Sequence, residues 1–327
     1  LNGGALAISE KSQINLSSSN KLTFDGGILR VNGDEFGTLY NDQFVWGAGG
    51  GGFYIEYLEN YFSVSKSLTG GGKLTKQGGG YLILTGDNSA MSGDVHVQRG
   101  TLQLRHYRPG QVNYTSEQNR IGDTSLVTID SGATILFDFS KPFERIGALA
   151  GGGAIDLGTD GEIIVGDART TEFSGILMGD IEDEGDVSGK LTKVGTGTLT
   201  LSGNNRHNRG TEIREGTLSI GKSSNLSIFS DNPLIFSGGM LQITGANIAS
   251  INHPITWGNN GVGFDIVEAT HTLTVSDAVT GNGGLIKRGA GTLALTGNNT
   301  YQGDTIIESG TLQLTGSNGS GTEKIEI

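Results

Sequence analysis

The sequence lacks cysteine, so neither a disulfide framework nor a zinc site with cysteine ligands can form. Only four prolines occur in 327 residues, which suits continuous β-sheet because proline cannot donate a hydrogen bond to a neighbouring strand. No apolar run reaches the length of about 18 residues that a membrane-spanning helix needs. Basic residues are also scarce. The 22 lysines and arginines against 34 acidic residues give a net charge of −12, which argues against nucleic-acid binding.

Glycine, by contrast, is abundant at 57 residues, and it is concentrated in a stretch that the chain repeats. The stretch runs over residues 285–314 and recurs at 74–104 and 191–220. Each copy contains short runs of alternating apolar and polar residues between Gly or Gly-Asn-Asn turns, which predicts short β-strands. We interpret the Gly and Asn residues of these turns as the source of the positive φ that sharp corners need.

A longer repeat surrounds these copies, because residues 22–104 are echoed by residues 234–314. Trp46 returns as Trp257 and Phe53 as Phe264, each at an offset of about 211 positions. Aromatic side chains that recur at a fixed offset are expected to stack in a buried core. Self-similarity built from strand-sized units is typical of a solenoid. With roughly 20 to 25 residues in each coil, we predict an all-β, parallel β-helix of about fifteen coils with loop insertions, forming a single domain over 1–327.

The repeated unit, Leu-Thr-Lys-x-Gly-x-Gly-Thr-Leu-x-Leu-Thr/Ser-Gly-Asn-Asn followed by Gly-Thr-Leu-x-Leu, resembles the passenger-associated repeat of autotransporters, the self-secreting surface proteins of Gram-negative bacteria. Three full copies and partial ones cover most of the chain. The resemblance implies a right-handed parallel β-helix that is exported through the periplasm and the outer membrane to the extracellular side or the cell surface. It also implies a partner in the full-length precursor, its own C-terminal outer-membrane β-barrel. Neither a signal peptide nor that barrel is in the sequence, which begins and ends within repeats, so we expect a segment of a longer passenger.

Function in a solenoid is expected where the repeat pattern is interrupted, in loops or on an extended face. An aromatic stretch at 40–62 contains three tyrosines without echoes. One basic stretch, at 105–120, follows the first repeat copy, and a second, at 206–209, lies within the second copy, where the third copy has Asn-Thr-Tyr-Gln. Solvated loops and core aromatics are the alternative interpretations of these segments. If the two basic stretches lie on one side of the rod, they can act together. The candidate partner-binding residues are Tyr54, Tyr57, Tyr61, Arg105, His106, Tyr107, Arg108, Tyr114, Arg206, His207 and Arg209.

Two further chemistries receive little support. The acidic run at 180–186 has enough carboxylates for calcium, but its spacing matches neither an EF-hand loop nor the Gly-Gly-x-Gly-x-Asp calcium nonapeptide, so an exposed charged loop is the default interpretation. Five scattered histidines accompany no catalytic motif, and we therefore expect neither an enzyme nor a cofactor.

Three functions remain open. The resemblance favours a virulence-associated passenger that binds a host-cell receptor, matrix or glycan, either as an adhesin or as a released receptor ligand or toxin. A stalk or self-association scaffold that presents an upstream domain is the second. A carbohydrate-active β-helix enzyme is the third.

Overall fold

The computed structural model describes residues 1–9, 16–17, 19–33, 38–39, 43–105, 120–138, 143–179, 189–316 and 325–326. These residues form two compact units, unit 1 (1–164 and 175–188) and unit 2 (165–174 and 189–327). Within the described ranges the one helix is η2 (Ser223–Asn225), a 3-10 turn. No described helix has the length and apolar character to cross a membrane.

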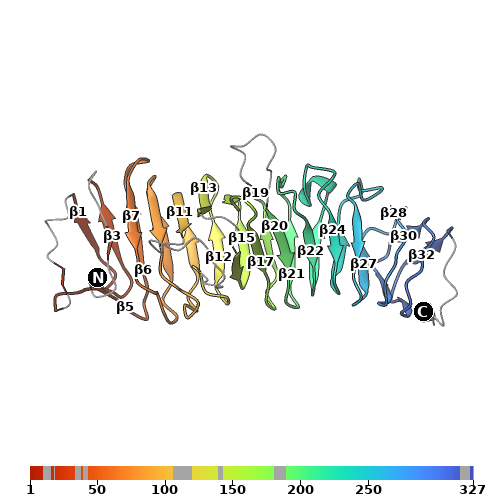
Figure 1. The fold of residues 1–327 in the computed structure, drawn as a ribbon, viewed down its shortest axis with the longest axis horizontal. Helices are drawn as coiled ribbons and strands as arrows, with labels where there is room; N and C mark the ends of the chain where they lie inside the picture. The colour runs from red at the N-terminus through yellow and green to blue at the C-terminus, as the bar shows by residue number, and fades with distance from the viewer. Residues whose placement is uncertain are drawn as a thin grey trace. The chain divides into compact units, whose positions relative to one another are not determined.

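Unit 1 is built from short parallel strands that stack in sheets, one strand from each coil (Figure 1). Its longest run contains β1 (Ala5–Ile8), β3 (Gly27–Val31), β6 (Gly51–Ile55), β8 (Leu74–Gln77), β10 (Val95–Val97), β12 (Leu126–Ile129) and β15 (Ala148–Gly151). A second sheet contains β4 (Thr38–Leu39), β7 (Tyr61–Val64), β9 (Tyr81–Leu84), β11 (Gly100–Arg105), β13 (Ala133–Asp138), β16 (Ala154–Asp156) and β19 (Ile176–Met178). The remaining strands are β2 (Leu22–Phe24), which pairs with β5 (Phe44–Trp46), together with β14 (Phe143–Ile146) and β17 (Glu162–Val165).

Unit 2 repeats this plan with three sheets. Its long run contains β18 (Thr171–Phe173), β21 (Thr198–Leu201), β23 (Thr217–Ile220), β25 (Met240–Ile243), β27 (Val262–Ile266), β29 (Leu285–Arg288), β31 (Thr305–Ile307) and β33 (Ile325–Glu326). The sheet that precedes it along each coil contains β20 (Lys190–Lys193), β22 (Thr211–Ile213), β24 (Leu234–Phe236) and β26 (Ile255–Trp257). The third sheet contains β28 (Thr272–Val275), β30 (Thr292–Leu295) and β32 (Thr311–Leu314).

Strand pairing confirms the predicted parallel solenoid. Leu29 of β3 lies beside Phe53 of β6, a coil of 24 residues, and Leu285 of β29 lies beside Thr305 of β31, a coil of 20 residues. Both lengths come close to the range predicted from the repeats. The chain makes about 12 turns, slightly fewer than the fifteen coils predicted.

Stacked aromatic rings fill the core where the sequence echo predicted them. In unit 1, Phe24 lies 5.0 Å from Phe53 and 5.5 Å from Trp46, measured between ring centroids. Phe53 is fully buried and Trp46 is 8% exposed. In unit 2, the rings of Phe236 and Trp257 stack at 5.4 Å. The prediction that Trp46 and Phe53 belong to the core is therefore confirmed.

The asparagines of the Gly-Asn-Asn turns do not have the positive φ that we inferred for them from the sequence. Positive φ occurs at glycines, and the only described non-glycine residue with positive φ is Asp160. The second Asn of each turn is instead buried and binds the adjacent coils: Asn88 accepts from the Leu68 N–H at 2.6 Å and donates to the Arg120 carbonyl at 2.7 Å, while Asn299 accepts from the Val279 N–H at 3.0 Å. These asparagines are selected for hydrogen bonding between coils, because the backbone there needs no left-handed residue.

A buried lysine in each repeat copy holds the corner that follows its strand. The Lys76 ammonium donates to the carbonyls of Gln77, Gly78 and Arg99 at 2.9, 2.8 and 2.9 Å. Lys193 and Lys287 make the same three contacts, each binding its own corner and the corner of the next coil. Three carbonyl acceptors satisfy the three donors of an ammonium group, which explains how a lysine can be fully buried in the core.

Candidate partner-binding surfaces

Unit 1 exposes a cluster of apolar and aromatic side chains between β6 and β7. Tyr57 is 53% exposed, Leu58 is 72% exposed and Tyr61 is 57% exposed. We call these three residues the tyrosine corner. Side chains of this size are usually buried in a solenoid, and a cluster of them in solvent is typical of an interaction site.

Tyr54, the third predicted tyrosine, lies beside the corner and is half-buried. The Arg30 guanidinium lies 4.3 Å from the centre of its ring, a cation–π contact, and Arg30 also lies 3.9 Å from Glu56. This packing holds Tyr54 against β3, so it supports the corner from one side and offers less free surface than Tyr57 and Tyr61.

Unit 2 contains a matched corner with different surface residues. Glu268, Ala269 and Thr272 stand at the echo positions of Tyr57, Leu58 and Tyr61, and all three are exposed. The two corners share the same backbone hydrogen bond. The Asn60 N–H donates to the Tyr57 carbonyl at 3.1 Å, and the His271 N–H donates to the Glu268 carbonyl at 3.0 Å. In both corners the next coil donates a backbone hydrogen bond of 2.8 Å, from Tyr81 to the Asn60 carbonyl and from Thr292 to the His271 carbonyl. The corner therefore folds equally well with polar side chains, and the tyrosines are not required by the backbone.

Arg105, at the end of β11, pairs with Asp138 of the adjacent strand at 2.6 Å, and its side chain is 45% exposed. The positive charge of the Arg105 guanidinium is therefore balanced by the Asp138 carboxylate on the protein itself. The other predicted residues of this stretch, His106, Tyr107, Arg108 and Tyr114, lie outside the described residues, as does the acidic run at 180–186.

The second basic stretch belongs to unit 2, and its residues differ in exposure. Arg206 and Arg209 are exposed, which suits a partner-binding role. His207 is fully buried and its Nε2 lies 2.8 Å from the Thr211 hydroxyl, so its prediction as a surface contact is wrong. His207 lies in the corner between β21 and β22, where its ring turns into the core and meets the Thr211 hydroxyl, while Arg206 before it stays exposed.

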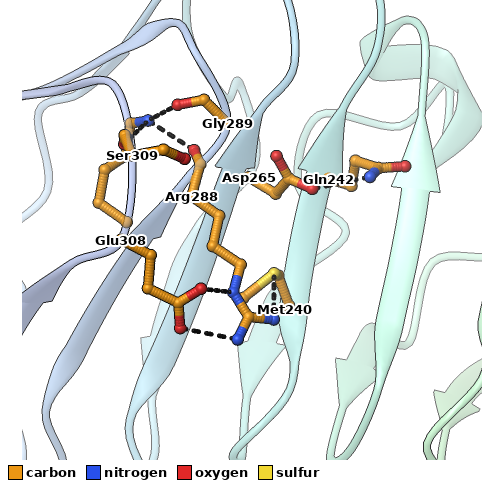
Figure 2. A network of polar contacts seen from close by, with 8 residues as sticks. Met240, Gln242, Asp265, Arg288, Gly289, Glu308 and Ser309 are labelled. Carbon is orange, nitrogen blue, oxygen red and sulfur yellow. Dashed lines mark hydrogen bonds and ion pairs between the residues drawn. The ribbon is translucent and has the colours of Figure 1, made fainter.

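A groove of about 410 Å³ crosses the outer face of the long sheet in unit 2. Its floor is formed by Met240, Gly263, Ile286 and Ile306, and the absence of a side chain at Gly263 makes the hollow, because a Cβ there would lie 2.7 Å from the Met240 methyl. Figure 2 shows the polar edge of this face, where Arg288 donates from Nε and Nη2 to the two carboxylate oxygens of Glu308. On the same face Gln242 donates to Asp265 at 2.7 Å. This second surface was not predicted, because an outward groove depends on which strands lie side by side.

Among the described residues, the hydrogen bonds of His96 and His271 do not form a catalytic triad. His96 of β10 lies 2.9 Å from Asp130, which directly follows β12, and this pair is partly buried. His271 lies 2.9 Å from the Ile248 carbonyl. No group of three or more His, Asp or Glu side chains placed to hold a metal occurs among the residues that the structure describes.

Comparison with known proteins identifies the repeats. The family model described as Passenger-associated-transport-repeat matches residues 74–104, 191–220 and 285–314. The Adhesin BmaC autotransporter of Brucella suis biovar 1 (strain 1330) is 36% identical over 209 residues, which are 63% of this chain and 6% of that protein. YfaL of Escherichia coli (strain K12), named a probable autotransporter, is 25% identical over 356 residues, 95% of this chain and 27% of YfaL.

An Extracellular serine protease of Serratia marcescens is 60% identical, but only over 42 residues, 13% of this chain and 4% of the protease. The match covers too little of the protease to carry its activity over to this chain. The chain spans only a small part of the curated relatives it matches, from 4% to 27% of their length in these three cases. No solved structure matches the chain.

Proposed function

The chain is an autotransporter passenger domain with passenger-associated transport repeats, and on this premise we propose that it is an adhesive passenger that binds a host-cell protein or glycan through the tyrosine corner. Passengers of this family are secreted or exposed at the cell surface by way of the outer membrane. The Brucella suis relative, 36% identical over 209 residues, is named an adhesin, which supports binding rather than catalysis.

The observation that carries the proposal is the difference between the two matched corners. The same backbone corner bears Glu268, Ala269 and Thr272 in unit 2 but two tyrosines and a leucine in unit 1, at more than half exposure. Exposed apolar surface gives no stability to the folded chain and raises the risk of aggregation. A partner that covers these side chains accounts for their presence, since Tyr is enriched at binding hot spots.

The exposed arginines of unit 2, Arg206 and Arg209, form a second proposed contact for acidic or sulfated groups on the partner. Guanidinium groups bind carboxylates and sulfates through paired donors. In a chain of net charge −12, such cations also favour the approach of an acidic partner in the correct orientation.

Binding of the purified, labelled chain to cultured human cells tests the proposal. The decisive variant carries Tyr57→Glu, Leu58→Ala and Tyr61→Thr, the residues that the matched corner already tolerates. We expect saturable binding by the wild type and a loss of at least tenfold in this variant, as expected when hot-spot side chains worth about 2 kcal/mol are removed. Ile228→Ser, which removes an exposed apolar side chain from unit 2, is the control and should bind normally.

Other outcomes separate the alternatives. If Arg206→Glu with Arg209→Glu abolishes binding while the tyrosine variant binds normally, the contact lies in unit 2. If the wild type does not bind cells but forms concentration-dependent dimers in sedimentation experiments, the chain is a self-association scaffold. If it does neither, the stalk interpretation replaces the proposal.

A further inference from the structure

The groove of unit 2 runs along the solenoid axis, across neighbouring coils. Its floor follows one column of outward positions, in which adjacent strands pair Thr217 with Met240, Met240 with Gly263, Gly263 with Ile286 and Ile286 with Ile306. At about 4.8 Å between strands, these four steps span about 19 Å. The floor is therefore a mainly apolar trough, and its length suits a linear ligand.

Polar groups stand along both edges of the trough. On one edge, Arg288 donates from Nε and Nη2 to Glu308, while its Nη1 reaches back over two coils to within 3.9 Å of the Met240 sulfur (Figure 2). A thioether is a weak acceptor, so a ligand oxygen would be a better partner for Nη1. On the other edge, Asn260 and Asp304 are exposed at the corners before β27 and β31.

The charges at the groove select against an anionic ligand. Asp265 pairs in register with Arg288, Glu308 binds its guanidinium, and Asp304 lies on the opposite edge. These three carboxylates would repel a negatively charged ligand, because like charges placed together are unfavourable. Ionised carboxylates accept several hydrogen bonds each, and a hydroxyl group both donates and accepts. A neutral ligand rich in hydroxyl groups therefore matches both the carboxylates and the guanidinium.

Unit 1 has the same column of positions with a different floor. The echo positions of Ile286 and Ile306 hold Thr75 and His96, which pair with one another in register as the isoleucines do. A threonine and a histidine thus fit the same parallel strands. The fold does not require isoleucine at either position, and a ligand that covers them accounts for the apolar floor of unit 2.

The ion pair at the edge of the groove is also specific to unit 2. Gln77 and Gln98 stand at the echo positions of Arg288 and Glu308, and the Gln77 side chain donates to that of Gln98 at 2.7 Å. A neutral pair therefore joins these two coils in unit 1. The charged pair adds to unit 2 a guanidinium nitrogen that reaches over the floor, which the glutamine pair does not provide.

The shape of the groove favours a sugar chain over an extended peptide. A peptide strand would turn every second side chain toward the floor, at intervals of roughly 7 Å, whereas the coils repeat about every 4.8 Å. A pyranose ring has apolar C–H faces and a rim of hydroxyl groups. This distribution matches an apolar floor between two polar edges.

We propose that the groove of unit 2 binds a neutral linear oligosaccharide along the solenoid axis. The C–H faces of the sugar rings lie on Met240 and Ile286, and the hollow at Gly263 brings one ring close to the backbone. Hydroxyl groups accept from Arg288 Nη1 on one edge and donate to Asp304 on the other. This site lies in unit 2, apart from the tyrosine corner, and it does not depend on the function proposed above.

Calorimetric titration of the purified chain with neutral linear pentasaccharides tests the site. The probes are cellopentaose, maltopentaose, laminaripentaose, xylopentaose and penta-N-acetylchitopentaose. We expect saturable binding of at least one, and a loss of about tenfold or more when Ile286→Thr is combined with Arg288→Gln, the residues of unit 1. Val267→Thr is the control, since Val267 is 39% exposed on the coil of Gly263 but does not line the groove, and it should bind normally.

Gly263→Ala is a second variant that should fold, because Gly263 does not have positive φ and the nearest atom to the added Cβ is the flexible end of Met240, at 2.7 Å. It raises the floor and should also weaken binding. Circular dichroism confirms that each variant is folded.

The proposal is overturned if none of the five probes binds saturably, or if both groove variants bind as tightly as the wild type. It is also overturned if binding is lost in the tyrosine-corner variant instead, since the sugar would then lie on unit 1. Concentration-dependent dimers that the Ile286→Thr, Arg288→Gln variant abolishes would show that a second copy of the chain occupies the groove.

Discussion

Replacing Lys76 by methionine tests what holds the solenoid corners together. The ammonium group donates to three carbonyls at 2.8 to 2.9 Å, two in its own corner and one in the next coil, and the side chain is fully buried. Methionine keeps the apolar stem but removes all three donors. The variant therefore separates the hydrogen bonds from the packing of the side chain.

Two opposing contributions decide the magnitude. Burying an ammonium group costs several kcal/mol, and hydrogen bonds from a charged donor return about 1.5–3 kcal/mol each. In the wild type these contributions nearly cancel. In Lys76→Met, however, the carbonyls lose their donor inside the corner, at a cost of about 1 kcal/mol or more each. We expect a destabilisation of about 3 kcal/mol, concentrated at the contact between neighbouring coils because a solenoid is stabilised locally.

Urea unfolding monitored by tryptophan fluorescence measures the loss, and hydrogen exchange locates it. Lys73→Met is the matched control, since Lys73 is exposed and lies three residues earlier on the same segment. Its effect should stay within about 0.5 kcal/mol. Equal stability of the two variants, or a more stable Lys76→Met, would refute the reasoning by showing that the burial cost exceeds the value of the three bonds.

The same lysine predicts a pH dependence. Burial lowers the pKa of Lys76 from 10.5 to about 7, so between these values the unfolded chain binds more protons than the folded chain. Stability should therefore rise as the pH increases from about 7 toward 10.5. Lys76→Met should reduce this slope by the contribution of Lys76, while Lys193, whose pKa burial lowers to about 8, keeps its own contribution.

Two further predictions concern the stability of the chain at low pH and the cost of replacing corner glycines by alanine. Burial lowers the pKa of His207 from 6.5 to about 4, so stability should fall by roughly 3 kcal/mol as the pH drops through this interval, and acid titration of His207→Tyr should lack the loss. Gly100 has φ 71°, and a Cβ there would lie 2.4 Å from the Gly78 carbonyl oxygen, whereas Gly132, at φ 83°, has open space around it. Gly132→Ala should cost about 1–2 kcal/mol from backbone strain alone, while Gly100→Ala should cost clearly more in urea unfolding; equal costs would show that the corner can relax.

Repeat spacing in the sequence was sufficient to predict the solenoid and its aromatic core. The recurrence of Trp46 and Phe53 as Trp257 and Phe264 marks equivalent core positions in the two units, and in each unit the two rings contact one another, at 6.3 Å between centroids. The same comparison separated Tyr57 and Tyr61, which have no aromatic echo, from the core aromatics. Their exposure agrees with that distinction, although their role in binding stays a proposal.

Contacts between coils could not be predicted from the sequence pattern. Lys76 and Lys287 recur in the repeats, yet a charged residue in an alternating run suggests an outward position, and only the three carbonyls of two corners explain its burial. His207 was placed on the surface because arginines flank it. Its true position depends on Thr211 at the end of the corner, whose hydroxyl lies 2.8 Å from the His207 Nε2. Polar residues that bond across coils give no periodic signal of their own.

The middle repeat copy shows that the motif specifies a corner and not a face of the solenoid. In the third copy, the lysine strand β29 belongs to the long sheet and the following strand β30 to the third sheet of unit 2. In the middle copy, the lysine strand β20 lies in the preceding sheet, and the following strand β21 occupies the long sheet. The lysine contacts are nevertheless the same. A unit whose stability comes from its own corner and from the next coil can be placed at either corner of the coil, which allows such chains to gain or lose coils without disturbing the rest.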